Sequence, residues 1–258
     1  MKILVIFGSA RRKNSFLVTK QFETALQKLA DYNFEYIFLN KVDLKICKGC
    51  HVCLFYGEEK CPLNDIAADI FSKMLEADGI IFVSPVYVSQ VTGLMKNFID
   101  RFSFLCHRPQ LYHQHSMIIS TTGVMDLKSV LNYLEKVSLM WGMRSVTKLG
   151  IVTPPDKEKK EITGDKRIIK TARQFHKQMK AENWSPKLSQ LIQFRAQKTF
   201  LTSEKIKEFS PRDFQYYSQI KKQSYHIPVK INIFKRLISW LVEKMIQFQV
   251  KKRKNKVT

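Results

Sequence analysis

The stretch KILVIFGSARRKNSF, residues 2–16, decides how the rest of the chain is interpreted. Its first part, Lys2–Phe7, is a short run of mostly apolar residues, which is typical of a strand buried on both faces. The loop that follows begins with Gly8, and a pattern of apolar residues at helical spacing covers Phe16–Ala30. A strand, a polar loop and a helix in this order predict the first half of a βαβ unit.

The same alternation continues through about the first 150 residues. It predicts further strands at Phe34–Leu39, Gly79–Ser84, Ser116–Thr122 and Ser145–Val152, and further helices at Ile66–Leu75, Leu94–Leu105, Leu127–Met140 and 164–182. Five strands alternating with helices predict a doubly wound α/β fold with a five-stranded parallel sheet, since crossovers between parallel strands need such helices. In such a sheet the ligand binds beyond the carboxyl ends of the strands, so the loops after Phe7, Ser84 and Thr122 are the candidate site.

The loop after the first strand carries the groups that bind a phosphate. Ser9, Asn14, Ser15 and the arginines supply donors beside the first turn of a helix, whose free N–H groups and dipole favour anions. The loop has one glycine, Gly8, and therefore matches neither a dinucleotide-binding nor a P-loop pattern, which favours the doubly wound order that binds FMN. The alternative is a capped turn with solvated arginines.

Four of the five cysteines lie within 15 residues, at Cys47, Cys50, Cys53 and Cys61. Three thiols separated by two residues each, and a fourth after a short loop, suit a [4Fe–4S] cluster, and the bacterial ferredoxin run begins with the same spacing. Two alternatives remain: a zinc site formed by Cys47, Cys50, Cys53 and either His51 or Cys61, and free or disulfide-exchanging thiols. The fifth cysteine, Cys106, ends a predicted apolar helix and is expected at the edge of the core.

The C-terminal part differs in charge from the rest of the chain. Residues 1–150 contain 18 Lys and Arg against 13 Asp and Glu, whereas residues 151–258 contain 26 against 9. Prolines divide 184–258 into Lys-rich helical pieces, and the last piece, Ile231–Val250, has an apolar face and is expected to be a partly buried amphipathic helix. No run is long and apolar enough for a membrane span or a signal peptide, so a cytoplasmic protein is expected.

These motifs together resemble the flavodoxin-like NADPH-dependent FMN reductases, and within them the iron–sulfur flavoproteins. The resemblance covers about residues 1–150. It rests on motifs that occur in the family's order, namely Gly8-Ser9-x-Arg11 with Asn14-Ser15, the cysteine run, Ala77–Tyr87, Val91–Lys96 with Phe98–Arg101, and Thr121-Thr122-Gly123.

The resemblance implies a cofactor site and, together with the change of pattern after residue 183, a domain organisation. Residues 1–183 would form a flavodoxin-like FMN-binding domain with a cysteine loop at 45–63, and 184–258 would form a basic helical extension. Residues of the first loop would hold the FMN phosphate: Ser9, Arg11, Asn14, Ser15 and Phe16. The later loops would line the flavin ring and reach its polar atoms: Pro85, Val86, Tyr87, Thr121, Thr122 and Gly123. The metal ligands would be the four clustered cysteines, and no protein acid or base is assigned a catalytic role.

The expected function is an FMN-dependent oxidoreductase or electron-transfer flavoprotein that couples FMN to a [4Fe–4S] cluster. NAD(P)H or reduced ferredoxin would be the donor, and a homodimer or homotetramer is expected. The first alternative is an NAD(P)H-dependent FMN or quinone reductase without a cluster. The second is a basic protein that binds nucleic acid or, through its C-terminal helix, a membrane surface, of which the nucleic-acid function is the weaker hypothesis.

Overall fold

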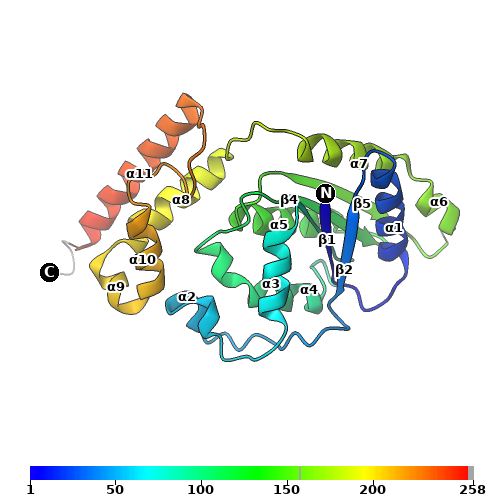
Figure 1. Ribbon diagram of the computed structural model, residues 1–258, viewed down its shortest axis with the longest axis horizontal. Coiled ribbons are helices and arrows are strands. Elements are labelled where there is room, and N and C mark those ends of the chain that lie inside the picture. Colours follow the sequence, from blue (N-terminus) through cyan, green and yellow to red (C-terminus); the bar gives the residue numbers. More distant parts are fainter. Residues whose placement is uncertain (157, 255–258) are drawn as a thin grey trace. The chain divides into compact units, whose positions relative to one another are not determined.

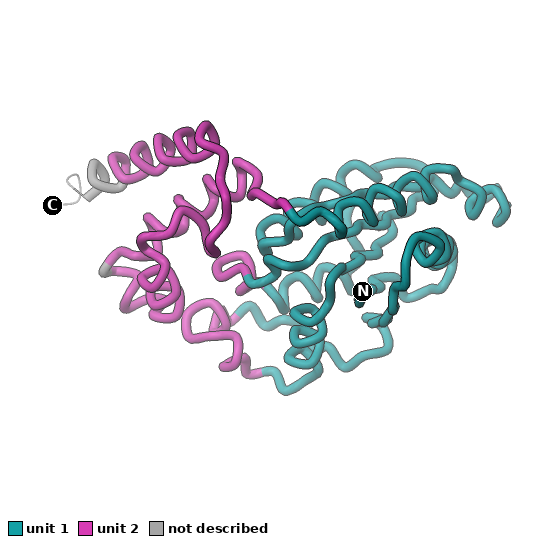
Figure 2. The backbone as a smooth tube through the Cα atoms, turned by 45° about the horizontal axis from the view of Figure 1, so that its top comes forward, with its two compact units in different colours: residues 1–49, 63–102, 110–182 teal, residues 50–62, 103–109, 183–258 magenta. Residues whose placement is uncertain are grey.

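The computed structural model describes residues 1–156 and 158–254 and separates the chain into two compact units. Unit 1 consists of Met1–Gly49, Leu63–Phe102 and Gln110–Glu182, and unit 2 of Cys50–Pro62, Ser103–Pro109 and Asn183–Thr258 (Figure 2). The last junction between the units adjoins the domain boundary predicted from the sequence. Unit 2 also takes in two short segments from within the predicted FMN-binding domain.

Unit 1 contains a five-stranded sheet in which every pairing is parallel. Its strands are β1 (Lys2–Phe7), β2 (Asn33–Phe38), β3 (Gly79–Val83), β4 (His115–Thr122) and β5 (Val146–Val152), in the order β2-β1-β3-β4-β5. This is the strand order of flavodoxin-like folds, in which the order of strand addition reverses between β1 and β3. The predicted fold class is therefore confirmed.

The helices of unit 1 begin and end close to the predicted positions. They are α1 (Asn14–Gln27), α3 (Ala67–Glu76), α4 (Gly93–Arg101), α5 (Leu127–Met140), α6 (Lys159–Thr163) and α7 (Lys166–Met179). The short helix α6 lies before the helix predicted at 164–182 and was not itself predicted. The predicted helix is α7, which the side chain of Asp165 caps by accepting the Arg167 N–H and which ends earlier than predicted, at Met179. The helix predicted at Leu94–Leu105 likewise ends at Arg101, and a short 3₁₀ turn, η2 (Ser103–Cys106), follows it.

Alternating residues of the central strands build a core on each face of the sheet. Ile3 and Val5 of β1 belong to the same apolar cluster as Phe22 of α1 and Phe175 of α7, and these two helices lie side by side (Figure 1). Phe82 of β3, by contrast, packs against rings of α4 and of the end of α5. The centre of its ring lies 6.3 Å from that of Phe98 and 6.0 Å from that of Trp141. All residues of β3 are buried, as a strand covered by helices on both faces requires.

Unit 2 is helical. Besides η2 it contains α2 (Val52–Phe55), η1 (Glu58–Lys60), α8 (Leu188–Leu201), α9 (Glu204–Phe209), α10 (Pro211–Gln219) and α11 (Ile233–Lys254). Phe194, Tyr217 and Tyr225 form its buried core, and Pro211 occupies the first turn of α10, where a missing N–H costs nothing. Within the described residues no helix is both long and apolar enough to cross a bilayer.

The last helix, α11, is partly buried as expected, but through its polar residues. Ser239 and Glu243 are buried, whereas Phe234, Leu241 and Met245 are exposed. The reason is that Arg195 of α8 binds both Ser239 and Glu243 and so fixes which side of α11 packs against α8.

Candidate functional site

Three loops of unit 1 meet at the carboxyl edge of the sheet. The N–H of Gly8 donates to the Val83 carbonyl at 2.8 Å and places the loop after β1 beside the loop after β3. The loop after β3 then continues along β4, because the N–H of Val86 donates to the Thr121 carbonyl at 2.9 Å. All the predicted cofactor residues therefore belong to three segments that converge at one edge of the sheet.

Gly8 allows this close approach of the segments. A Cβ atom on it would lie 2.9 Å from the Cβ of Met95 and 3.0 Å from the Val83 carbonyl oxygen. The Gly8 carbonyl accepts a hydrogen bond from the Thr92 hydroxyl, and the same Thr92 oxygen caps α4 by accepting the Met95 N–H at 3.2 Å. Sequence reasoning missed Thr92, although a threonine directly before a helix is a recognisable capping signal.

The start of α1 offers backbone donors to an anion. Its N-cap residue, Lys13, makes no side-chain cap, and the first N–H groups of any α-helix lack partners within the helix. The buried Ser15 hydroxyl lies 2.6 Å from the Thr121 hydroxyl, which joins this first turn to the end of β4. Ser9 is buried in the same loop, where its hydroxyl accepts the Arg11 N–H at 3.3 Å. These groups suit a phosphate at the positive end of the helix.

The two neighbouring arginines have different surroundings. The Arg11 guanidinium lies 3.4 Å from the Tyr87 hydroxyl, across the edge of the predicted site, whereas the Arg12 guanidinium lies 4.0 Å from the centre of the Phe38 ring. Phe16 packs against the core, with its ring 5.9 Å from that of Phe7, so its predicted contact with phosphate would have to come from the backbone. Of the two arginines, Arg11 is therefore the one placed to contact an anion.

The loop after β3 exposes an aromatic side chain on a strained turn. Tyr87 is 42% exposed and exchanges backbone hydrogen bonds with Gln90 at 2.9 and 3.0 Å. Between them Val88 and Ser89 have φ angles of 48° and 62°, and positive φ is unfavourable for a β-branched valine. Backbone strain of this kind is typical of ligand-binding loops.

The loop after β4 is tied to the same turn. The Ser89 hydroxyl donates to the Asp126 carboxylate at 2.5 Å, and the Thr122 hydroxyl donates to the Met125 carbonyl at 2.8 Å. Gly123 is exposed, and a Cβ atom there would meet nothing within 4 Å. Sequence reasoning did not find Ser89 or Asp126, because a contact 37 residues apart leaves no local pattern.

The residues present fit FMN. The site combines backbone donors and hydroxyls at a helix N-terminus with an exposed aromatic ring, and a flavin nucleotide needs both a phosphate anchor and a flat wall.

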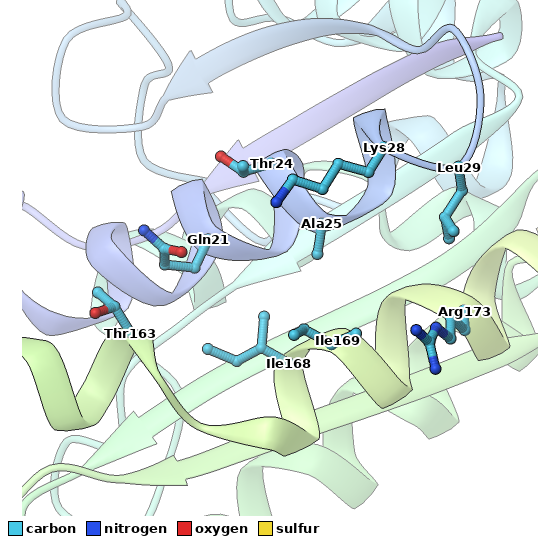
Figure 3. Close-up of a pocket in the computed structure, with 9 residues that line it drawn as sticks. All are labelled: Gln21, Thr24, Ala25, Lys28, Leu29, Thr163, Ile168, Ile169 and Arg173. Carbon is cyan, nitrogen blue, oxygen red and sulfur yellow. The ribbon is translucent and has the colours of Figure 1, made fainter.

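A separate pocket of about 250 Å³ lies between α1 and the α6–α7 segment (Figure 3). Its lining, which includes Lys28, Ile168 and Arg173, shares no residue with the predicted cofactor site.

The cysteines are distributed between the two units. Cys47 lies in unit 1, where its N–H donates to the Asn97 side chain at 3.0 Å, and Cys50, Cys53 and Cys61 lie in unit 2. Cys50 is exposed, and the other three are half-buried. Among the described residues no three His, Cys, Asp or Glu side chains are grouped closely enough to hold a metal ion. The thiols supply the donor chemistry that an iron–sulfur cluster requires.

A buried arginine holds the cysteine segment of unit 2. Arg108 donates to the carbonyls of Cys53 at 2.6 Å and Leu54 at 2.9 Å, and Asp213 binds its guanidinium from the other side. Burial raises the pKa of Asp213, but hydrogen bonds and charges from His107 and Arg108 outweigh it, so that this pKa lies below its ordinary value. Sequence reasoning missed this brace, since Arg108 is separated from Asp213 by 105 residues and from Cys53 by 55.

Comparisons with known proteins agree with this arrangement. The family model described as NADPH-dependent FMN reductase matches residues 1–154. An iron–sulfur flavoprotein of Archaeoglobus fulgidus is 33% identical over 146 residues, which are 55% of this chain and 64% of that protein. An iron–sulfur flavoprotein of Clostridioides difficile is 28% identical over 223 residues, 85% of this chain and 96% of that one.

Some of these similarities cover only part of the relatives. This chain spans between 48% and 64% of the first three curated relatives. Among solved structures, an NAD(P)H:quinone oxidoreductase from Methanothermobacter marburgensis superposes with a TM-score of 0.52 at 19% identity, over 68% of this chain and 97% of that one. That likeness shows the shared fold.

Proposed function

The chain belongs to the NADPH-dependent FMN reductase family, and on that basis we propose that it is an FMN-dependent oxidoreductase that transfers electrons between FMN and a [4Fe–4S] cluster. The observation that carries the flavin part is the convergence of three loops at the carboxyl edge of the sheet, where β1 and β3 are joined by the Gly8–Val83 hydrogen bond. The spacing of the four clustered cysteines and the names of the relatives support the cluster.

Each part of the site has a separate task in this proposal. FMN, when bound, supplies hydride and two-electron chemistry, and a [4Fe–4S] cluster supplies single-electron transfer. The first turn of α1, with Ser9, Ser15 and Arg11, binds the phosphate. Tyr87 and the backbone of Pro85 and Val86 orient the ring, and the loop of Thr121, Thr122 and Gly123 offers donors and acceptors to its polar edge.

The cluster would be held by Cys47, Cys50, Cys53 and Cys61. Metal ligands often come together only when the metal binds, because metal binding and local folding are coupled. Arg108 fixes the backbone at Cys53, which limits how far that part of the loop can move. NAD(P)H or reduced ferredoxin is the proposed donor, and a homodimer or homotetramer the proposed assembly.

Cofactor analysis after purification without oxygen tests both halves of the proposal. We expect about one FMN and about four iron and four sulfide ions per chain, as a [4Fe–4S] cluster requires. Serine at any one of the four clustered cysteines should lower the iron content, while Cys106→Ser, at a half-buried cysteine outside the run, should leave it unchanged. Flavin without iron and sulfide would contradict the cluster and favour an NAD(P)H-dependent FMN or quinone reductase. A protein that binds no FMN would overturn the whole proposal.

The two arginines provide a matched test of the phosphate anchor. Arg11→Ala should weaken FMN binding by roughly tenfold or more, since a hydrogen bond to a charged group contributes about 1.5–3 kcal/mol. Arg12→Ala removes an equal charge one residue away, but from a guanidinium that stacks on Phe38, and should have a much smaller effect. Equal losses in the two variants, measured by FMN fluorescence titration, would mean that only net charge matters.

A further inference from the structure

The last helix, α11, presents an apolar face that no described part of unit 2 covers. Its residues Phe234, Met245 and Phe248 are 71%, 62% and 68% exposed. With Ile238 and Leu241 they form a series spaced by four, three, four and three residues, which places them in one continuous row along the helix. We call these five residues the α11 seam.

The orientation of the seam is fixed by buried charges on the opposite side of the helix. Arg195 donates to Ser239 at 3.0 Å and binds Glu243, and the Lys198 ammonium lies 3.5 Å from the same carboxylate. Turning the seam inward would separate these buried charges, which is costly. The seam is therefore held outward by the packing of α11 on α8.

The charges around the seam identify the kind of surface that it fits. α11 contains seven Lys and Arg and a single acidic residue, Glu243, which is buried against α8. Arg236 and Lys244 are exposed, and the Lys244 ammonium lies 5.8 Å from the centre of the Trp240 ring. The surface that faces outward along α11 is thus apolar, aromatic and basic.

A second copy of the chain is a poor occupant for this face. Helices paired through their seams would bring Lys244 of each copy, which lies beside the seam, near the basic residues of the other, and the one carboxylate of each helix is already bound to Arg195. Like charges at such positions oppose helix pairing. A surface that is negative outside and apolar beneath matches the seam and its charges together.

We propose that α11 attaches the protein to anionic lipid bilayers, with the seam at the boundary between headgroups and acyl chains and the lysines and arginines among the lipid phosphates. A basic helix with phenylalanine, tryptophan and leucine on its other side is the usual form of such an interfacial anchor. The whole segment 184–258 adds to the attraction, because it contains 17 Lys and Arg against 4 Asp and Glu. This function is independent of the cofactors.

Sedimentation of the complete protein with vesicles tests the proposal. We expect binding to vesicles of phosphatidylcholine with phosphatidylglycerol and little binding to phosphatidylcholine alone, with a loss at high salt. The double variant Leu241→Gln and Met245→Gln should bind roughly tenfold more weakly or worse, because interfacial binding scales with buried apolar area. Both positions are exposed, so the fold should tolerate the change. Ile169→Gln, at an exposed apolar residue of α7, is the matched control.

Two further measurements separate the alternatives. Trp240 is exposed in the seam's surroundings, so its emission should shift to shorter wavelength when anionic vesicles are added, and Trp240→Phe should abolish the shift. Equal binding to neutral and anionic vesicles would overturn the proposal. The proposal would also be overturned if the molecular mass in solution rose with protein concentration and fell to that of the monomer in the double variant. A second copy of the chain would then cover the seam. Flavin and iron contents should not differ between the variants and the parent.

Discussion

At the scale of single residues, Gly8 matters both for the packing of the sheet and for the candidate site, because there is no room for a side chain at this position. Replacing it with alanine would place a methyl group 2.9 Å from the Cβ of Met95 and 3.0 Å from the backbone at Val83. Neither contact is the flexible end of a side chain, so the neighbouring segments have to separate. We expect Gly8→Ala to lower the free energy of unfolding by about 1–3 kcal/mol, as overpacking generally does, and to weaken FMN binding.

Gly93 provides the matched control for this prediction. It begins α4 close to Gly8, but a Cβ atom there meets nothing within 4 Å. Gly93→Ala should therefore leave stability unchanged or raise it by up to about 1 kcal/mol, because alanine is the better helix former. The free energies of unfolding of both variants and the parent, measured in urea, test the prediction. A Gly8→Ala protein as stable as the parent would show that Met95 moves aside without cost.

The sequence predicts individual residues of the site unevenly. Ser9, Arg11 and Ser15 could be found because a strand, a loop and a helix follow one another within a few residues. Thr92 could have been found by its capping position. The Ser89–Asp126 bond and the brace of Arg108 on Asp213 could not, because their partners lie far apart in the chain and only the fold brings them together.

At the scale of elements, the packing of α11 on α8 depends on a buried charge. Glu243 binds Arg195 and lies 3.5 Å from Lys198, and burial lowers the pKa of Lys198 although Glu243 opposes that effect. Glu243→Gln would leave two buried cations without their carboxylate. We expect it to destabilise the α8–α11 pair by about 3 kcal/mol and to increase hydrogen exchange of the α11 amides.

The control for Glu243 is an exposed glutamate of the same unit. Glu208→Gln in α9 removes the same charge from the surface and should leave exchange in α11 unchanged. Similar hydrogen exchange in the two variants would show that apolar contacts alone hold α11.

The sequence predicts α11 and its apolar face from periodicity. It does not predict which face is buried, because that depends on Arg195, which lies 44 residues before Ser239.

At the scale of the whole molecule, the fold class follows from the alternation of short apolar runs with helical patterns, whereas the strand order is favoured by the single glycine of the loop after the first strand. The division into two units is less visible in the sequence, since Cys50–Pro62 and Ser103–Pro109 belong to unit 2 although they lie far from its other residues in the chain.

Each unit contains a buried histidine. Burial lowers the pKa of His226 in unit 2 to about 3, and burial together with the charge of Arg144 lowers that of His115 in unit 1 to about 4.

These histidines predict that acid destabilises both units. In the unfolded chain a histidine takes up a proton near pH 6.5, whereas the folded chain resists protonation until about pH 4 or below. The unfolded state therefore binds more protons in this range, and the free energy of unfolding falls as the pH decreases from about 6.5, by at most about 1.4 kcal/mol per pH unit for each histidine. His226→Gln should make this dependence shallower, and His113→Gln, at an exposed histidine, should not. Unfolding curves of the parent and both variants across this pH range test the prediction, and a slope that His226→Gln leaves unchanged would mean that His226 is protonated in the folded protein.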